Sequence, residues 1–271
     1  MLFSCSNYGQ LKLKANLPKK LKEASGIACG VGNEVLWMHN DGGNKNVLYQ
    51  VDSKGKIQKT LEVKAKNTDW EDIASDDEGN LYIGDFGNNA NTRDDLVILK
   101  LKNKDLVDKK NIEVIKIKFY YPNQHKFPPK KKKRFFDAES LLYFNNYLYI
   151  FTKSRVKKEY GKTSLYKIPA KAGRHEAIYI SSFNNCTKTN CWITAASISK
   201  DKKKVALLTH NTVLLFTDFK SDDFLNGTLK KYNLEHTSQK EGVDFKDNNT
   251  LYITDERAHG KGGKLYELKL E

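Results

Sequence analysis

The phrase Ser25-Gly26-Ile27-Ala28 recurs along the chain, each time with a polar or small residue two places before an aliphatic one. The later copies are Glu71-Asp72-Ile73-Ala74, Glu139-Ser140-Leu141, Ala196-Ser197-Ile198 and Glu241-Gly242-Val243. Each copy precedes a second apolar segment: Leu36-Trp37-Met38, Leu81-Tyr82-Ile83, Leu148-Tyr149-Ile150, Val205-Ala206-Leu207 or Leu251-Tyr252-Ile253. A repeat of roughly 45 to 70 residues indicates a solenoid, a propeller or another array of supersecondary units.

Turns rich in Gly, Asn or Asp separate the two segments of each copy, as in β-hairpins. Third and fourth alternating segments follow in most units, which predicts the four-stranded antiparallel blades of a β-propeller. The last unit lacks a fourth segment, and 10–15 has the alternation to supply it from the other end of the chain. The sequence therefore predicts an all-β, five-bladed propeller over 9–271, after an N-terminal segment 1–8. A sixth blade within 105–136 and an open solenoid are the alternatives.

Composition agrees with a polar globular protein, with 39% hydrophobic and 30% charged residues among 271. No apolar run is long enough to span a bilayer. The chain is also expected to be a monomer. The net charge of +14 is compatible with binding of an anionic polymer or with an ordinary lysine-covered surface. The densest basic run, 128–134, is better explained as a solvated loop than as a nuclear localisation patch.

The four cysteines bear on the cellular compartment. Cys186 and Cys191 bracket a turn-like stretch, which indicates a disulfide in an oxidising compartment or half of a zinc site. Cys29 is expected to be a buried free thiol. Leu2-Phe3-Ser4-Cys5 resembles the end of a bacterial lipoprotein signal, although the preceding apolar region is missing. If the match is real, the protein is exported and lipid-anchored in the envelope, in the periplasm or at the cell surface.

Two columns of residues are expected at one mouth of the ring, because the first strand of each blade begins where the second ends. The first column is Ser25, Glu71, Glu139, Ala196 and Glu241, and the second is Asn40, Asp85, Thr152, Thr209 and Asp255. Close carboxylates repel one another unless a cation, a basic side chain or a proton neutralises them. Calcium or magnesium would suit Glu71, Asp85, Glu139 and Glu241 as oxygen ligands. The alternative is that these carboxylates cap backbone amides and join blades.

Residues near these columns could bind a polar ligand. They are Asn40, Asp41, Trp70, Arg93, Lys153, Asp255 and Arg257. The glycine-rich loops 39–44 and 84–89 can turn Asp and Asn side chains inward for a cation, or can form Asx turns. Trp70 is expected to pack between blades, with stacking on a ligand as the second interpretation. His210 has no evident Ser or Cys partner, so it and Glu71 are the weak catalytic candidates.

The motifs Asp69-Trp70-Glu71-Asp72-Ile73-Ala74, Gly84-Asp85-Phe86-Gly87-Asn88-Asn89 and Glu241-Gly242-Val243-Asp244-Phe245 resemble those of exported bacterial propellers. That group is similar to the SdiA-regulated and phytase-like esterase propellers, and more distantly to gluconolactonase-like ones. The resemblance covers about 24–268 and implies the fold more than an activity. Asn88 and Gly42 stand where the group would carry an acid and a serine, which weakens a calcium site in the Asn88 loop.

Three functions follow as hypotheses. The first is an envelope propeller that binds a small polar ligand, a partner protein or a divalent ion without catalysis. The second is a metal-dependent hydrolase of a phosphoester, ester or lactone, in which the ion activates water. The third is a scaffold for an anionic polymer, whose binding would depend strongly on salt. Calcium or magnesium is the only cofactor that the sequence indicates.

Overall fold

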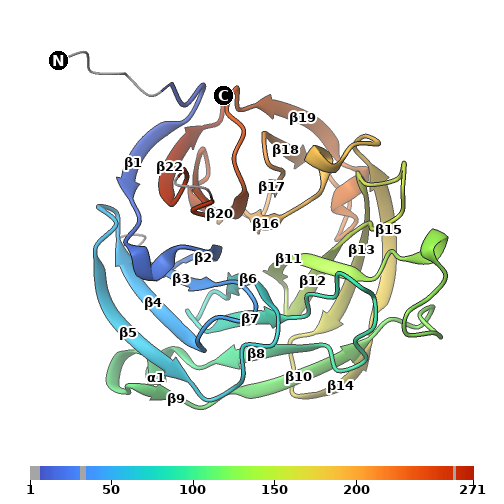
Figure 1. Cartoon of the computed structure of the whole chain (residues 1–271), viewed down its shortest axis with the longest axis horizontal. Coiled ribbons are helices and arrows are strands. Elements are labelled where there is room, and N and C mark those ends of the chain that lie inside the picture. The colour runs from blue at the N-terminus through green and yellow to red at the C-terminus, as the bar shows by residue number, and fades with distance from the viewer. Residues whose placement is uncertain (1–6, 31–34, 259–260) are drawn as a thin grey trace.

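Five antiparallel β-sheets surround a central axis in the computed structural model, which describes residues 7–30, 35–258 and 261–271 (Figure 1). Each sheet is one blade, with its strands in succession from the axis outwards. This confirms the predicted propeller of five four-stranded blades. The stretch 105–136, where a sixth blade was the alternative, adds strands to blades 1 and 2 instead.

The innermost strands of blades 1 to 5 line the axis: β2 (Ala24–Cys29), β6 (Trp70–Ser75), β11 (Asp137–Phe144), β16 (Ala195–Ile198) and β20 (Lys240–Asp247). The second strands are β3 (Val35–Asn40), β7 (Leu81–Asp85), β12 (Tyr147–Lys153), β17 (Val205–Leu208) and β21 (Thr250–Asp255). The third strands are β4 (Val47–Asp52), β8 (Val97–Leu101), β13 (Lys162–Pro169), β18 (Thr212–Thr217) and β22 (Lys264–Lys269). The outer strands are β5 (Ile57–Val63), β10 (Ile115–Tyr120), β15 (Ile178–Asn184), β19 (Thr228–Asn233) and β1 (Lys12–Asn16).

The ring is closed by β1, which pairs antiparallel with β22 and so completes blade 5 from the N-terminal side, as the sequence predicted. Two short strands also join neighbouring blades at the rim. The strand β9 (Asn111–Ile112) pairs parallel with β5, and β14 (Gly173–Glu176) pairs parallel with β10. The remaining elements are α1 (Asn103–Asp108), η1 (Lys19–Leu21), η2 (Lys131–Lys133), η3 (Thr189–Cys191) and η4 (Phe224–Asn226).

Apolar side chains form one buried cluster between each pair of neighbouring blades. Leu48, Trp70 and Leu99 belong to the cluster between blades 1 and 2, for example, and Phe245 and Ala206 to the one between blades 5 and 4. The alternation of the strand residues therefore buries both faces of each blade against its neighbours. Burial of this apolar surface is the main term that stabilises the ring.

Two buried carboxylates join blades near the axis. Asp72 is fully buried on β6, and its Oδ2 accepts hydrogen bonds from the backbone N–H of Leu141 (2.9 Å) in blade 3 and of Ala196 (3.3 Å) in blade 4. Asp244 of blade 5 accepts bonds from Cys29 N–H (2.6 Å) in blade 1 and from the Ser197 hydroxyl in blade 4. These two carboxylates, which were not among the candidates from sequence, have the blade-joining role that the sequence offered as the alternative for the column carboxylates.

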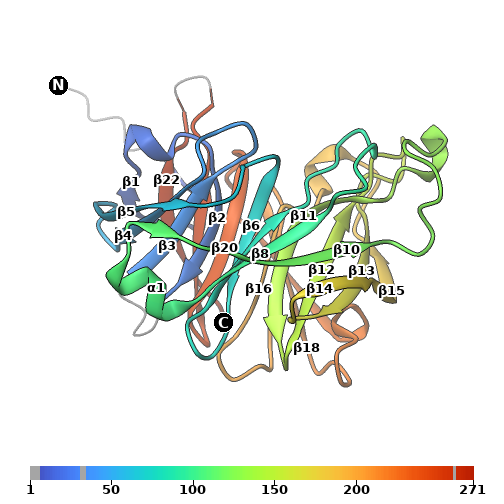
Figure 2. The ribbon, with the colours of Figure 1, turned by 90° about the horizontal axis from the view of Figure 1, so that it is seen from below.

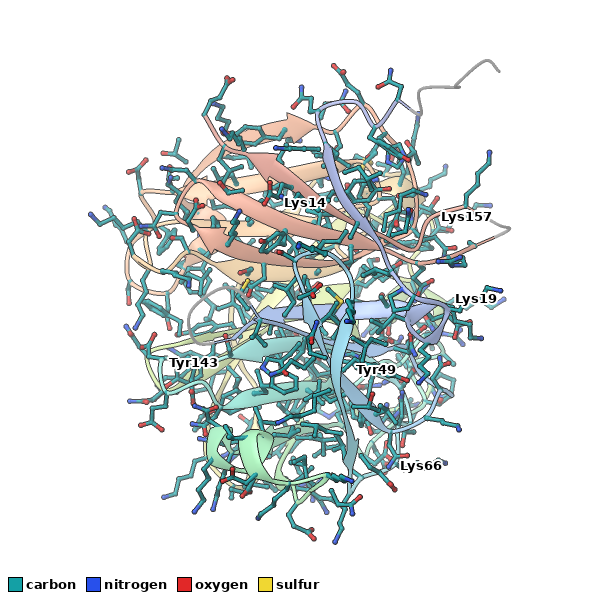
Figure 3. The ribbon with its side chains drawn as sticks, turned by 90° about the vertical axis from the view of Figure 1, so that its left-hand side faces the viewer. Lys14, Lys19, Tyr49, Lys66, Tyr143 and Lys157 are labelled. Atoms are coloured by element: carbon teal, nitrogen blue, oxygen red, sulfur yellow. A yellow bond between two sulfur atoms is a disulfide. The ribbon has the colours of Figure 1, made fainter. Side chains whose placement is uncertain are left out.

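The surface is rich in exposed lysines, such as Lys19, Lys66 and Lys157 (Figure 3). The basic run around η2 is exposed and lies in a loop at one end of the ring, the upper end in Figure 2. Within the described part of the chain, none of the helices has the length and apolar character needed to cross a membrane.

The cysteines occupy distinct environments. Cys186 and Cys191 form a disulfide with a Cα–Cα distance of 5.9 Å, so the disulfide interpretation holds and the zinc interpretation does not. Cys29 is a buried free thiol, as expected. Cys5 and most of the segment 1–8 lie outside the described residues, and the lipoprotein interpretation stays a prediction.

Candidate functional site: the acidic mouth of the ring

A β-bulge turns the polar residue of the repeated phrase toward one mouth of the ring in four of the five blades. The strand pairing shifts by one residue at Ser25 in β2, at Glu71 in β6, at Glu139 in β11 and at Glu241 in β20. In β16, where Ala196 takes this place, the pairing is regular. Bulges redirect side chains and are common beside functional sites. The first column is therefore uneven, because only blade 4 lacks both the bulge and a polar side chain at this place.

Three carboxylates from blades 1 and 2 meet at this mouth. Oxygen atoms of Asp41, Asp69 and Glu71 all lie within 4.8 Å of one another. Asp41 follows β3, Asp69 directly precedes β6, and Glu71 lies in the β6 bulge. Among the residues that the structure describes, no lysine, arginine or histidine forms an ion pair with any of the three. We call this group the carboxylate trio.

Backbone packs closely around the trio. A Cβ atom added at Gly87 would lie 2.0 Å from Glu71 Oε1, and one at Gly42 would lie 2.3 Å from Asp69 Oδ1. Any larger residue would therefore displace a carboxylate. Asn67 fixes the surrounding loops, because its Nδ2 donates to the carbonyl oxygens of Asn40 and Asp41 and its Oδ1 accepts from Trp70 N–H. The trio is thus held by a defined scaffold.

The electrostatics of the trio favour a neutralising partner. Burial is the main cause that raises the pKa of Asp41 to about 7; Glu139, Asp69 and Glu241 act in the same direction, and the Gly42 N–H bond opposes them. Burial, followed by Glu139 and Asp41, raises the pKa of Glu71 well above its usual range. The pKa of Asp69 is also raised, mainly by burial. Burial and the neighbouring negative charges both disfavour the ionised form of these groups, and a bound cation would reverse that effect.

Neighbouring carboxylates, in contrast, are neutralised by basic side chains. Asp85 accepts from Arg93 Nη2 (3.0 Å) and from Asp69 N–H (3.1 Å). Glu139 lies 2.7 Å from Lys153 Nζ and 3.1 Å from Arg155 Nη2. Burial opposes the charged form of Lys153, but Glu139 and Glu241 outweigh it and raise its pKa. Of the four metal ligands predicted from sequence, Glu71 alone belongs to the trio. Asp85 and Glu139 form ion pairs with arginine and lysine side chains instead.

A second set of ionisable side chains lies at the mouth near blades 4 and 5. His210 Nε2 lies 3.4 Å from Glu241 Oε1. Burial, then Glu241 and Asp41, raises the pKa of Glu256 to about 8. The loop of His210 is held by the buried Lys240, whose Nζ donates to the carbonyls of His210 (3.1 Å) and His236 (2.9 Å). His210 therefore has a carboxylate partner that the sequence did not reveal.

Several predicted ligand residues serve the fold. Trp70 is fully buried and packs edge-on against His39, which leaves no open face for a ligand. Asn40 bonds to Glu23 N–H and to the carbonyl of Lys20. Asp255 accepts from Lys264 N–H and from the Tyr266 hydroxyl, and Arg257 donates to the carbonyl of Leu17.

Three residues at the mouth were not among the candidate site residues predicted from the sequence. Asp69 stands in the quoted motif two places before Glu71, so strand alternation could have suggested that the two carboxylates lie on one side. Arg155 stands two places after Lys153, so strand alternation could have suggested a shared target. Trp192, which contacts both of these basic side chains, carries no such signal because its position depends on the disulfide loop.

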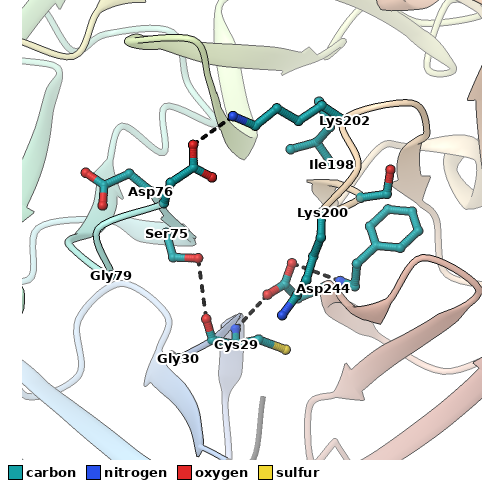
Figure 4. A pocket seen from close by; sticks show the side chains of 12 residues that line it. Cys29, Gly30, Ser75, Asp76, Gly79, Ile198, Lys200, Lys202 and Asp244 are labelled. Carbon is teal, nitrogen blue, oxygen red and sulfur yellow. Dashed lines mark hydrogen bonds and ion pairs between the residues drawn. The ribbon is translucent and has the colours of Figure 1, made fainter. Parts of the chain in front are cut away.

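A separate cavity of about 300 Å³ lies at the other end of the axis. It is lined by strand and loop residues of blades 1, 2, 4 and 5, among them Cys29, Asp76, Lys202 and Asp244 (Figure 4). Lys202 Nζ spans to Asp77 at 2.7 Å, so the two charges at its rim neutralise each other. The carboxylate trio is not part of this cavity.

Fold and mouth together define a five-bladed β-propeller with a partly uncompensated acidic mouth. The sequence matches no protein-family model and no curated protein. Solved structures with this kind of fold include the PQQ-bound aldose sugar dehydrogenase of Streptomyces coelicolor, with 11% identity, a TM-score of 0.57 and coverage of 97% of this chain and 98% of that one. A gluconolactonase of Xanthomonas campestris has 11% identity, a TM-score of 0.51 and coverage of 97% and 89%. At this identity the likeness shows the propeller fold alone.

Proposed function

We propose that the protein binds a divalent cation, calcium or magnesium, through the carboxylate trio at the mouth of the ring. One observation carries the proposal: three buried or half-buried carboxylates converge within 4.8 Å with no ion pair among the described residues. Hard divalent cations prefer such oxygen ligands. The bound ion would offset the mutual repulsion that raises the three pKa values.

A cation held by three carboxylates would keep coordination positions for water and for a ligand, since calcium takes six to eight oxygen ligands. The mouth also presents Lys153, Arg155 and Arg93, although each is bonded to a carboxylate. We therefore propose a small polar ligand with oxygen donors, bound to the ion and within reach of these side chains. In this proposal the protein is a binding propeller.

The raised pKa values give a pH dependence. Asp41 and Glu71 must lose protons to coordinate an ion, so the cation competes with protons. We expect calcium affinity to rise as pH increases from about 5.5 to 8, because the pKa of Asp41 is about 7. Isothermal titration calorimetry in two buffers of different ionisation enthalpy measures both the affinity and the released protons. An affinity that is constant over this range, with no proton release, would contradict the proposal.

The same groups set the opposite trend for the metal-free fold. A carboxyl with a raised pKa binds more protons folded than unfolded, so its contribution to stability falls as pH rises from its unfolded to its folded pKa. For Asp41 that window lies between about 4 and about 7. A cation should therefore raise the melting temperature more at pH 8 than at pH 5.5.

A metal-dependent hydrolase is the second candidate. Two observations favour it: the approach of His210 to Glu241 (3.4 Å), and the pKa of about 8 for Glu256. A carboxyl such as Glu256, whose pKa lies near neutrality, suits general acid–base catalysis, and a bound cation can activate water. Phosphoesters, esters and lactones are the substrate classes to assay, each with His210→Gln. If no class is turned over with calcium or magnesium present, the non-catalytic function stands.

Cellular location and partners complete the proposal. We propose an exported envelope protein, lipid-anchored through Cys5, because the Cys186–Cys191 disulfide suits an oxidising compartment. We also propose the relationship to SdiA-regulated and phytase-like propellers that the sequence motifs indicate, a group that is often exported. The partner is a small molecule or an envelope protein, and the net charge of +14 leaves an anionic polymer as the alternative. Fractionation of native cells tests this, since recovery of the chain with the cytosol would exclude a lipid anchor.

A further inference from the structure

The disulfide lies next to a tryptophan that contacts the basic side chains of the mouth. Cys191 ends η3 in the loop between β15 and β16, and Trp192 follows it directly. The Trp192 ring lies 5.1 Å from Lys153 Nζ and 4.9 Å from the Arg155 guanidinium carbon. Cation–π attraction favours both positions. Trp192 therefore supports the two cations that neutralise Glu139.

The other half of the disulfide is fixed to the loop that follows β12. Gly161 N–H donates to the carbonyl of Cys186 (3.0 Å), and Asn185 N–H donates to the carbonyl of Gly161 (3.0 Å). A Cβ at position 161 would lie 2.3 Å from Cys186 O, so this approach requires glycine. Trp192 Nε1 donates to the carbonyl of Ser154 (2.8 Å). The disulfide thus links Cys191, the residue before Trp192, to Cys186, whose backbone is bonded to Gly161. Trp192 itself is bonded to Ser154.

These contacts form a chain from the disulfide to the carboxylate trio. Arg155 also bonds to Asp137 through Nε (2.6 Å). The Leu141 N–H bond to Asp72 Oδ2 (2.9 Å) holds β11 beside β6, so Glu139 and Glu71, each on one of these strands, lie at the same mouth. Glu139 has the largest charge effect on the pKa of Glu71. The electrostatic potential beside the trio depends on how closely Lys153 and Arg155 stay paired with Glu139. Both disulfide cysteines are partly exposed to solvent, so a reductant can reach them.

We propose that the Cys186–Cys191 disulfide, acting through Trp192 as a positioning residue, sets the charge at the mouth and makes its cation affinity redox-sensitive. The proposal rests on the proposed function, because it concerns the regulation of the same site. Reduction by a dithiol breaks the bond between the two Sγ atoms and forms two thiols. The dithiol supplies two electrons and two protons and becomes a disulfide itself.

Reduction should tighten divalent-cation binding. Without the disulfide, Trp192 keeps its Nε1 bond to Ser154 but loses the covalent restraint on its backbone. Its ring is then held less firmly beside Lys153 and Arg155, and the two cations lose part of their support against Glu139. Glu139 is then less neutralised, so the field at the trio becomes more negative. We expect calcium affinity to rise about fivefold or more, the lower end of typical coupling between sites.

The test uses the full chain with Cys5→Ser and Cys29→Ser, so that Cys186 and Cys191 are its only cysteines. Calorimetry with calcium chloride compares the oxidised protein, the dithiothreitol-reduced protein and Cys186→Ser/Cys191→Ser. Trp192→Leu in the oxidised protein should bind as tightly as the reduced form and should not respond to reduction. Trp192→Phe keeps an aromatic face and should stay close to the oxidised parent. Hydrogen exchange at the Gly161 and Asn185 amides reports loosening of the loop without any metal.

The outcomes separate this proposal from the proposed function. Equal calcium affinity in both redox forms, with faster exchange at Gly161 and Asn185, would contradict the redox proposal alone. A Trp192→Leu protein that still responds to reduction would also overturn it, because the coupling would then bypass Trp192. If neither redox form binds calcium or magnesium, the proposed function fails and the regulation fails with it.

Discussion

Replacement of Asp72 by alanine is expected to lower the free energy of unfolding by about 3 kcal/mol or more. The change leaves the N–H groups of Leu141 and Ala196 without their acceptor, and each unsatisfied buried donor costs about 1–3 kcal/mol. A loss of this size is a large part of the ~5–15 kcal/mol typical of a folded domain. Urea denaturation followed by fluorescence measures it.

The matched variant Asp72→Asn separates the hydrogen bonds from the charge. Burial raises the pKa of Asp72 well above its usual range, so charge alone adds little to the fold. The asparagine carbonyl can still accept from blades 3 and 4, and we expect the loss to stay near 1 kcal/mol, the net value of one ordinary hydrogen bond. Equal losses for Ala and Asn, or a loss below 1 kcal/mol for Ala, would show that Asp72 does not join the blades.

Replacement of Glu71 by glutamine is expected to abolish stabilisation by calcium. At a free calcium concentration about 100 times its Kd, the wild-type chain should gain about 2.7 kcal/mol. For a chain of this size that gain corresponds to a rise of roughly 5 °C or more in melting temperature. Glu71→Gln removes one of the three charged ligands, so the rise should vanish. The metal-free melting temperature should stay equal or increase, since repulsion with Asp41 and Asp69 falls.

The control is Glu62→Gln, an exposed carboxylate on β5, which should keep the full calcium response. A Glu71→Gln protein that is stabilised by calcium as strongly as wild type would exclude Glu71 as a ligand. A wild-type protein with no response to calcium or magnesium would exclude the site itself.

The repeated phrase was sufficient to predict the ring, because its aliphatic member is buried blade core in four copies and Ile198, in the fourth copy, is partly buried against the same kind of cluster. Ile27, Ile73 and Leu141 are buried at the blade interfaces, and β1 closes blade 5 as its alternation indicated. The rim strands β9 and β14 were not predicted. Both are short and pair across blades, so the local alternation of residues gave no sign of their partners.

The site was predicted less fully, since it depends on how bulges and loops aim the side chains. Glu71 was expected at the mouth and lies there, but Asp69 was not among the candidates. Asp85 and Glu139 were candidate metal ligands, and they are paired instead with Arg93 and with Lys153 and Arg155. Such pairing depends on atomic distances across blades, which residue spacing cannot give. Trp70, in contrast, packs between blades 1 and 2 as the sequence predicted, because its ring is fully buried in their shared core.

Anomalous diffraction from a crystal grown with manganese, a divalent ion that carboxylates bind, tests the central claim most directly. The account predicts one strong peak at the mouth, about 2–2.5 Å from oxygen atoms of Asp41, Asp69 and Glu71, which disappears in Glu71→Gln. A map without a peak at the trio, or with the ion bound only at Asp85, Glu139 or the opposite end of the axis, would contradict it.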